Sequence, residues 1–550
     1  MLMKFIQNQL LKKETLATAS KLLEGKWLKD STKLPLLFEE IIKPHNRVCL
    51  EGDNQKQAVY LAKGLCKVNP QIVNNLHIVQ SCLSLPEHVE IFERGIASKV
   101  DFCYSSGQGA RVMNLAAEGK IEMKAIHTYL ELFSRYFLDL TPNVALLVAE
   151  KADRAGNLYT GANTEETPAI AEATAFKDGI VIVEVNEIVD ELPRVDIPAS
   201  WVDVLVHSPT PQMVKPLFTR DPAKIDEVKI LMAMMAIKGI YAKYGVNRLN
   251  HGIGYATSAV ELLLPTYAES LGLKGKICQY MVINPCPTLI PAIESGFIKT
   301  ICSPGGEVGM NEYVRAHADI FFNGSDGSQR SNRAFAQLAG LYAIDMFVGG
   351  SLQIDLMGNS STATIERMTG FGGAPNLGSD INARRHSSDT WLKAGAEYAQ
   401  TQDKTLLKGR KLVVQMVETF QAAGQPTFVE ELDALTLQKK MKMPLPPIMI
   451  FGDDVTHIVT EIGIANLLLC KDLAEREQAI RAVAGYTPVG LAKDPQKVAE
   501  LHKRGAIQYP EDLGIRFSDA TRDLLAAKSI KDLVEISGGL YNPPSMYRDW

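Results

Sequence analysis

The sequence predicts an α/β protein with two similar domains, each built on a mainly parallel sheet with helices packed against it. Three observations predict this class. Short apolar strands alternate with helical segments along most of the chain, which is typical of parallel sheets. The chain has 550 residues, more than one hydrophobic core normally supports. The same arrangement of glycine turns and strands also occurs twice.

The first half supplies four candidates for buried strands, at residues 47–51, 77–81, 144–150 and 179–185. Each is an apolar run of strand length, and helical or loop material separates one from the next. Helical periodicity over residues 55–67 follows the first strand directly, interrupted only by Gly64.

The second half follows the same plan. The glycine turn at 250–254 leads into a predicted helix at 257–264, and residues 277–283 and 351–359 read as strands. The most apolar long stretch, residues 335–350, is too short to span a bilayer, so we expect a buried core helix there.

The repeat can be measured from its glycines. Gly52 precedes the Gly156-Asn157 pair by 104 residues, and Gly252 precedes the Gly358-Asn359 pair by 106. Chance matches between glycines are common, but here a turn, a strand and a Gly-Asn pair agree in order and in spacing. We therefore expect a duplication, with a first domain at 1–225 and a second at 226–550. A helical connector at 225–243 opens the second domain, and a surface-wrapping extension begins near Gly485.

Composition excludes several classes of protein. The net charge of -5 argues against a nucleic-acid partner. The first twenty residues show no secretory signal, so we expect a cytoplasmic protein without membrane insertion. The eight cysteines form no C-x-x-C pair and are expected to be free, buried thiols. The ten histidines form no H-x-x-x-H pair, and no metal site is predicted.

Three glycine-rich segments have chemical content. The turns at Gly52, Gly252 and Gly254 let backbone N–H groups approach an anion, although a tight turn without a ligand is the better explanation for any one of them taken alone. The loop at 105–112 offers Gln108 and an arginine, Arg111, to a thioester or carboxylate, and a plain strand-to-helix loop is an equal alternative.

The third segment, residues 370–389, packs glycines beside a pair of arginines and His386. Such a loop can aim N–H groups at a developing oxyanion, and guanidinium groups suit a dicarboxylate. The alternative is a solvated arginine pair beside a loop. We predict that Gly372, Gly373 and Asn376 act in catalysis. The predicted contacts to substrate and thioester are Gly52, Asn54, Gln108, Gly109, Asn157, Asn163, Gly252, Gly254, Arg384 and Arg385.

Long strings in the chain resemble the alpha subunits of malonate decarboxylase, which are related to family I coenzyme A transferases and, more distantly, to citrate lyase alpha subunits. The strings are LEGDNQKQA, SSGQGARV, NLYTGANTEETPAIAEA and GFGGAPNLGSDINARRHSSDTW, and the likeness covers almost the whole chain. It implies two coenzyme A transferase-type domains and an enzyme that exchanges acetyl for malonyl on a carrier-protein thioester, releasing acetate.

The resemblance also implies partners. These are an acyl carrier protein, whose phosphoribosyl-dephospho-coenzyme A group holds the thioester, and separate decarboxylase subunits; no cofactor is expected to be covalently bound to this chain. Many coenzyme A transferases use a glutamate nucleophile near the start of the second domain. Asn284, Pro285 and Cys286 occupy that position here, and Glu294 comes too late. Direct attack of the incoming acid on the thioester is the route that this departure favours.

Two alternatives remain open. One is a coenzyme A transferase or hydrolase acting on free acyl-coenzyme A, which would form a covalent glutamyl adduct. The other is a non-catalytic scaffold subunit that holds a carrier protein and a decarboxylase. Cys286 as a nucleophile is a weaker idea than a buried structural thiol.

Overall fold

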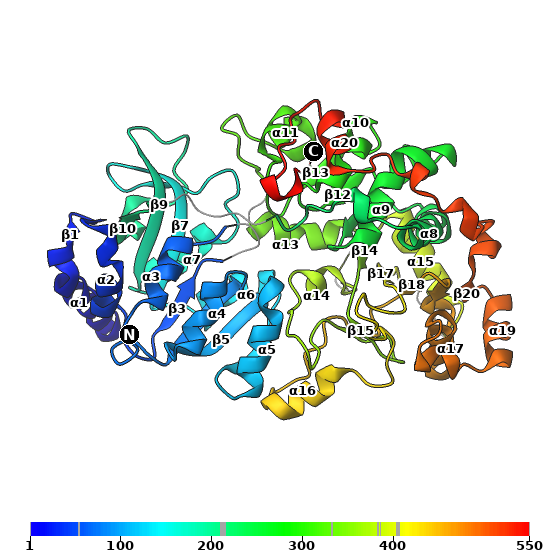
Figure 1. The fold of residues 1–550 in the computed structure, drawn as a ribbon, viewed down its shortest axis with the longest axis horizontal. Coiled ribbons are helices and arrows are strands. Elements are labelled where there is room, and N and C mark those ends of the chain that lie inside the picture. Colours follow the sequence, from blue (N-terminus) through cyan, green and yellow to red (C-terminus); the bar gives the residue numbers. More distant parts are fainter. Residues whose placement is uncertain are drawn as a thin grey trace.

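The computed structural model describes residues 2–52, 56–209, 216–331, 334–381, 384, 387–402, 408–548 and 550. In this part of the chain, two large and mainly parallel sheets lie side by side with helices packed against them (Figure 1). The α/β class and the mainly parallel sheets predicted from the sequence are confirmed.

The first sheet has the strand order β1-β2-β10-β9-β7-β3-β4-β5-β6, with β8 paired to β7. Its strands are β1 (Leu23–Glu24), β2 (Trp27–Leu28), β3 (Arg47–Leu50), β4 (Leu76–Cys82), β5 (Ala97–Tyr104), β6 (Glu122–Ile126), β7 (Val144–Asp153), β8 (Leu158–Tyr159), β9 (Ile180–Val189) and β10 (Val204–His207). The helices around it are α1 (Leu2–Ala19), α2 (Leu34–Ile41), α3 (Val59–Cys66), α4 (Pro86–Glu93), α5 (Gly109–Ala117), α6 (Tyr129–Leu138) and α7 (Thr167–Phe176).

The second sheet has the order β13-β12-β11-β14-β17-β18-β19-β20. Its strands are β11 (Arg248–His251), β12 (Tyr280–Val282), β13 (Thr300–Cys302), β14 (Met346–Gly349), β17 (Leu412–Met416), β18 (His457–Val459), β19 (Ile464–Asn466) and β20 (Ile507–Gln508), and β15 (Gln353–Ile354) pairs with β16 (Ser360–Ser361). The helices are α8 (Glu227–Ala236), α9 (Tyr255–Leu263), α10 (Ile290–Glu294), α11 (Asn311–Ala316), α12 (Ala318–Phe321), α13 (Ala334–Ala343), α14 (Ala374–Leu377), α15 (Asp389–Ala399), α16 (Asp433–Met441), α17 (Leu473–Val483), α18 (Pro488–Leu491), α19 (Pro495–Lys503) and α20 (Ile530–Ile536).

The two sheets share one topology. The run β5-β4-β3-β7-β9-β10 in the first sheet has the same chain order and the same parallel pairing as β13-β12-β11-β14-β17-β18 in the second. Six strands agree in order and direction, as the duplication predicted from the glycine spacing requires. The exact division at residue 225 remains a proposal.

A small turn follows the central strand of the first sheet. Asp153 accepts hydrogen bonds from the main-chain N–H of Asn157 at 2.8 Å and from its side-chain amide at 2.8 Å. The amide oxygen of Asn157 accepts from the N–H of Ala199, and Gly156 has a φ of 91°. Asn157 is therefore held inside a structural turn by three hydrogen bonds.

The second half contains the same turn. Asp355 accepts from the N–H and from the side-chain amide of Asn359, each at 2.9 Å, and the Asn359 oxygen accepts from the N–H of Gly452. Gly358 has a φ of 84°. Each Gly-Asn pair in the predicted repeat thus closes an Asp-x-x-Gly-Asn turn with matching bonds.

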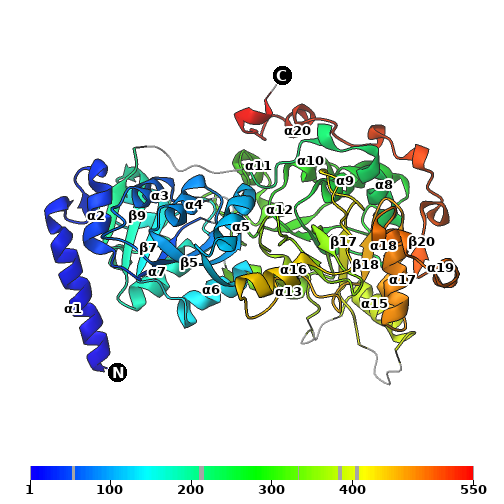
Figure 2. The same ribbon diagram turned by 60° about the horizontal axis from the view of Figure 1, so that its bottom comes forward.

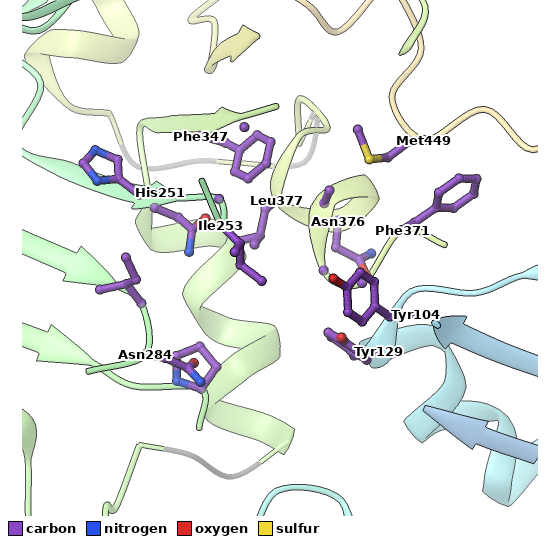
Figure 3. Close-up of a pocket in the computed structure, with 18 of the residues that line it drawn as sticks. Tyr104, Tyr129, His251, Ile253, Asn284, Phe347, Phe371, Asn376, Leu377 and Met449 are labelled. Carbon is purple, nitrogen blue, oxygen red and sulfur yellow. The ribbon is translucent and has the colours of Figure 1, made fainter. Parts of the chain in front are cut away.

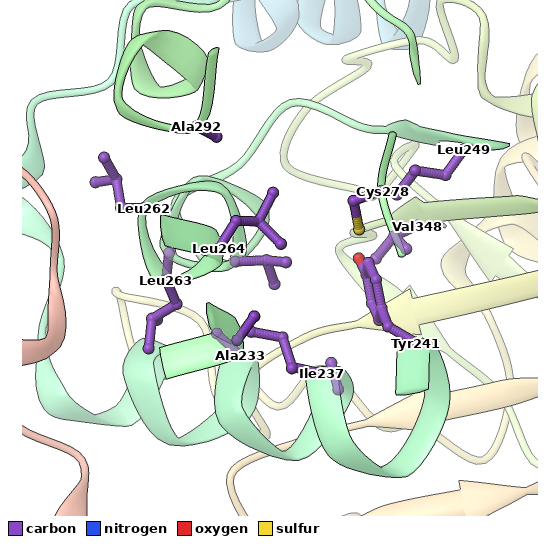
Figure 4. Packing of buried hydrophobic residues seen from close by; sticks show 14 of the residues in the cluster. Ala233, Ile237, Tyr241, Leu249, Leu262, Leu263, Leu264, Cys278, Ala292 and Val348 are labelled. Atoms are coloured by element: carbon purple, nitrogen blue, oxygen red, sulfur yellow. The ribbon is translucent and has the colours of Figure 1, made fainter. Parts of the chain in front are cut away.

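The cores lie on both faces of each sheet. Successive residues of a strand point to opposite faces, so in β14 Met346 and Val348 pack with α8 and α9 while Phe347 packs with α17. Figure 4 shows the first of these cores, where Tyr241 lies beside Cys278 and Val348.

One sequence prediction about the fold is wrong. Residues 335–350 do not form a single buried helix, because α13 ends at Ala343 and the chain then enters β14, a central strand of the second sheet. Both segments are apolar, and an unbroken apolar run does not distinguish a helix from a strand. The predicted strand at 277–283 is shorter than expected, since Cys278 has a φ of 56° and β12 begins at Tyr280.

The predicted connector and tail are both present. α8 continues into a π-helical segment, Ile237–Ala242, and leads directly to β11. The tail wraps along the second half (Figure 2). It also adds the edge strand β20, which pairs with β19, and it buries the side chain of Tyr541.

All eight cysteines lie in the described residues as free thiols, and seven of them are buried, as predicted. Within those residues, no helix is long and apolar enough to cross a membrane, and no group of side chains is arranged to hold a metal ion.

Candidate functional site

A cavity of about 520 Å³ lies between the two halves of the chain. Residues after β11, β12 and β14 of the second sheet form one side, and Tyr104 and Tyr129 of the first half form the other (Figure 3). β11 is flanked by β12 and β14, so strand order reverses there, and crevices at the carboxyl ends of parallel strands form at such positions.

The floor of the cavity is main chain. A Cβ atom added to Gly252 would lie 3.1 Å from both the Cα of Gly349 and the carbonyl oxygen of Val348. The Gly252 N–H donates to Val348 at 2.6 Å. Glycine at 252 therefore allows β14 to pass close beneath the turn, and the predicted Gly252 does line the cavity.

The opposite wall is formed by a loop of the second half that packs against the end of β5 in the first half. Gly370 forms an antiparallel bridge with Tyr104, and the N–H groups of Phe371 and Gly372 both donate to the carbonyl of Cys103. Gly370 has a φ of 82°, and a Cβ there would lie 2.4 Å from the oxygen of Cys103. The glycines of this loop thus serve first to join the two halves.

Asn376 and Gly373 supply polar groups on this wall. The hydroxyl of Thr128 donates a hydrogen bond to the side-chain oxygen of Asn376, and both Asn376 and Gly373 line the cavity. Within the described part of the chain, neither the Gly373 N–H nor the Asn376 side-chain amide donates to another group. Both remain available as donors to a ligand. Gly372 also lines the cavity, but its N–H is already bound to Cys103.

His251 sits at the other end of the cavity in a closed hydrogen-bonded chain. Its two ring nitrogens lie 2.8 Å from the hydroxyl of Tyr241 and 2.9 Å from a carboxylate oxygen of Glu261. The hydroxyl of Thr288 donates to the other Glu261 oxygen. All four side chains are buried, so these hydrogen bonds fix the orientation of the His251 ring.

Glu165 contributes a carboxylate to the cavity. Its side chain accepts from the amide of Asn163 at 2.7 Å, and its φ of 34° is unusual for a residue other than glycine. Asn284, at the position where the coenzyme A transferase pattern expects a glutamate, also lines the cavity and donates to the carbonyl of Gly306 at 3.0 Å. An amide at that position cannot form an acyl adduct.

The equivalent crevice in the first sheet is filled by its own polar groups. Glu51 accepts from the N–H of Val148 at 2.8 Å and from the hydroxyl of Thr167, and Lys56 lies 3.5 Å away with almost no exposure. Gly52 lies beside this cluster, outside the cavity, and Asn54 falls outside the described residues.

The loop at 105–112 packs as a structural junction. The N–H of Ser105 donates to Thr369 at 2.8 Å, and Gly109 begins α5 and accepts from the N–H of Met368. Gln108 accepts from Arg111, whose guanidinium also pairs with Glu93. Gln108 and Gly109 do not line the cavity, although they support the loop that does.

Of the remaining predicted residues, two have structural partners. Arg384 is buried and paired with Asp345, with Trp391 stacked against it, and it does not line the cavity. Gly254 takes an extended φ and accepts from the hydroxyls of Thr257 and Ser258 at the start of α9. Arg385 and His386 fall outside the described residues. Asn157 belongs to the turn described above.

Sequence reasoning missed several side chains that line the cavity, including Tyr104, Tyr129, Asn250 and Arg220. Arg220 is the cavity's one arginine or lysine within the described residues, and it lies in a polar stretch that resembles a linker. The thiol of Cys286 is buried, and burial raises its pKa well above the ordinary value, so it is a poor nucleophile.

Comparison with known proteins finds relatives along the whole chain. A family described as malonate decarboxylase, alpha subunit, transporter, matches residues 5–550. The acetyl-S-ACP:malonate ACP transferase of Malonomonas rubra is 55% identical over 542 residues, which cover 98% of this chain and 97% of that protein.

Two solved structures extend the comparison. A chain from a Pseudomonas malonate decarboxylase hetero-tetramer in complex with malonate is 53% identical, with a TM-score of 0.94 and 99% of each chain covered. The citrate lyase alpha subunit of Streptococcus mutans, described as putative in its structure, is 16% identical, with a TM-score of 0.58 over 84% of this chain and 87% of that one. The second likeness shows the shared fold.

Proposed function

This chain belongs to the malonate decarboxylase alpha-subunit family, and from that membership we propose that it transfers a carrier protein from acetate to malonate. It exchanges the acetyl group of an acetyl-S-carrier thioester for malonyl and releases acetate. The single observation that carries this function is the near full-length identity of 55% with an acetyl-S-ACP:malonate ACP transferase. The cavity between the halves is the proposed active site.

The cavity suits a thioester that is carried on a long prosthetic group. Its lining is mainly apolar, which is typical of small-molecule pockets of this size, and a few polar groups project into it. The thioester is carried by the phosphoribosyl-dephospho-coenzyme A group of the acyl carrier protein, which is a substrate here. The decarboxylase subunits act on the malonyl-carrier product, and the assembly works in the cytoplasm.

The reaction needs orientation and charge stabilisation more than acid–base chemistry. A malonate oxygen attacks the acetyl carbonyl carbon, the C–S bond breaks, and the carrier thiolate leaves with the electron pair, giving an acetyl-malonyl anhydride. The thiolate then attacks the malonyl carbonyl carbon and acetate departs. The Gly373 N–H and the Asn376 amide are two donors available for the oxyanion that forms in each attack.

Direct attack is favoured over a glutamyl-enzyme. Asn284 occupies the expected nucleophile position, and the glutamate that lines the cavity, Glu165, accepts a hydrogen bond from Asn163. After treatment with hydroxylamine or borohydride in the presence of acetyl-carrier, mass spectrometry should detect no modification of Glu165. A stable adduct on Glu165 would replace the direct route by a covalent one.

The test of function is an exchange assay with the purified chain, acetyl-carrier protein and labelled malonate. Label should reach the carrier without any partner subunit, and acetate should appear in equal amount. Exchange on free acetyl-coenzyme A in preference to the carrier would support the coenzyme A alternative. Complete absence of exchange would leave only the scaffold role.

A further inference from the structure

We infer that Arg220 binds the non-reacting carboxylate of malonate and thereby selects a dicarboxylate over acetate. This inference rests on the proposed function and assigns one residue within it. Arg220 lines the cavity, and within the described residues no carboxylate forms an ion pair with its guanidinium.

The Arg220 side chain is held in place on one edge only. Its Nη1 donates to the carbonyls of Leu217 at 2.6 Å and Thr219 at 3.0 Å, and its guanidinium lies 5.8 Å from the ring centre of Tyr255. The guanidinium carries five N–H donors in a planar fork. Bonds from Nη1 alone leave Nη2 and Nε for a carboxylate, and the fixed edge reduces the entropy lost when one binds.

The loop that carries Arg220 is anchored by a buried carboxylate. Glu307 accepts from the N–H groups of Phe218 at 2.9 Å and Thr219 at 3.2 Å, and from the Thr219 hydroxyl at 2.8 Å. Phe218 and Arg220 on either side of the buried Thr219 both line the cavity. Glu307 thus accepts hydrogen bonds from the loop and, within the described residues, forms no ion pair with the guanidinium. The positive charge of Arg220 is therefore available to a ligand in the cavity.

Charge in the cavity is otherwise sparse. Glu165 is its carboxylate, and the remaining polar lining is provided by the imidazole of His251, amides, hydroxyls and main chain. A malonate dianion entering a mainly apolar cavity loses hydration, and an arginine fork is the group best suited to replace that hydration at one end. The other carboxylate remains less tightly held and is the better nucleophile.

This arrangement allows the enzyme to distinguish malonate from acetate. Acetate has one carboxylate, which must be the reacting one, so it gains nothing from Arg220. Malonate is held by its second carboxylate before the attack, in the anhydride, and in the malonyl thioester. Arg220 should therefore raise the efficiency of the malonate reaction while leaving the acetate reaction unchanged.

The experiment compares two exchanges in the same protein. Labelled malonate measures malonyl transfer, and labelled acetate with unlabelled acetyl-carrier measures the degenerate acetate exchange through acetic anhydride. Arg220→Gln should lower kcat/KM for malonate by about 10- to 100-fold and change acetate exchange by less than about threefold. Arg220→Lys, which keeps the charge but not the fork, should fall between Gln and wild type.

Arg516→Gln is the matched control, because Arg516 is exposed and pairs with Asp519 on the surface. It should leave both exchanges at wild-type rates. Equal loss of both exchanges in Arg220→Gln, or no loss of malonate exchange, would overturn the assignment of Arg220 while leaving the transferase function intact. A wild-type protein that catalyses neither exchange would instead remove the proposed function, and this inference with it.

Discussion

Thr128 of the first half donates a hydrogen bond to the side-chain oxygen of Asn376 in the second half. The bond turns the amide N–H group of Asn376 away from Thr128 and leaves it available to the cavity that both halves line. One member of the proposed oxyanion site is thus oriented by a residue 248 positions earlier in the chain. Catalysis should therefore depend on how the two halves are joined as well as on the loop itself.

Asn376→Ala should lower kcat for malonyl exchange by about 10²- to 10³-fold, because one donor to a developing oxyanion is lost. KM should change little, since the donor acts mainly after attack has begun. Steady-state kinetics of label transfer to the carrier provide the measurement. Asn359→Ala is the control, because it removes an amide of the same kind outside the cavity; equal kcat in the two variants would argue against an oxyanion role.

Thr128→Val should lower kcat by about tenfold, since the hydroxyl that orients Asn376 is lost while the side-chain volume is kept. Thr128 also caps α6 by accepting from the N–H of Glu131, so some stability is lost as well. Thr128→Ser restores both bonds and should recover most of the rate. If Ser and Val gave the same kcat, the hydroxyl would have no part in orienting Asn376.

Gly370→Ala should weaken the junction between the halves. A Cβ at this position would lie 2.4 Å from the oxygen of Cys103, and the φ of 82° is costly for alanine. Malonyl exchange should fall and cleavage of the 362–373 loop by protease should accelerate. Gly119→Ala provides the comparison, because its φ of 73° carries the same backbone cost with no atom within 4 Å of the added Cβ. Comparable loss of exchange in both variants would show that the clash is unimportant.

The fold was largely predictable because its signals are local and repeated. Apolar runs such as residues 144–150 mark the central strands, and the Gly-Asn turns recur because each closes the same pair of hydrogen bonds to an aspartate. The prediction of a helix over 335–350 failed because α13 and β14 are both apolar and hydrophobicity alone does not separate a helix from a strand.

The cavity was only partly predictable. Gly252, Gly372, Gly373 and Asn376 line it, and the glycine loops drew attention to them. Arg220, Thr128 and Tyr104 carry no motif, and Thr128 and Tyr104 contact the 370–376 loop only because the two halves pack together. Conversely, Asn157 and Arg384 are residue types suited to ligand binding, but the Asn157 amide donates to Asp153 and the Arg384 guanidinium pairs with Asp345. Residue type alone does not show whether a polar group already has a partner.

The paired turns allow a test of the duplication. Asn157→Ala and Asn359→Ala should each cost about 1–3 kcal/mol, because each leaves an aspartate oxygen and a main-chain N–H without its partner. The two turns lie in different halves, so the double variant should show the sum of the two costs. Urea unfolding measures all three. A large cost at one turn with none at the other would mean that the turns are alike in geometry but not in energetic role.

Glu184 should make stability depend on pH. Its side chain is buried in β9 and accepts from the N–H of Leu61 at 2.9 Å. Burial raises its pKa from 4.5 to about 8, against the opposing effect of the backbone hydrogen bonds. Between those two values the folded protein holds a proton that the unfolded chain has released. The free energy of unfolding should therefore fall as pH rises through this window.

Glu184→Gln isolates that effect, because glutamine keeps the shape and the acceptor for Leu61 but does not titrate. The stability of Glu184→Gln relative to wild type should increase from about pH 5 to pH 8 and level off above it. Other titrating groups, such as His127 with its raised pKa of about 9, are present in both proteins and cancel in the difference. Urea unfolding at pH 5, 6.5, 8 and 9 gives the comparison. A difference that stays constant across this range would mean that Glu184 is already ionised in the folded protein at pH 5, with its charge stabilised by the backbone N–H groups.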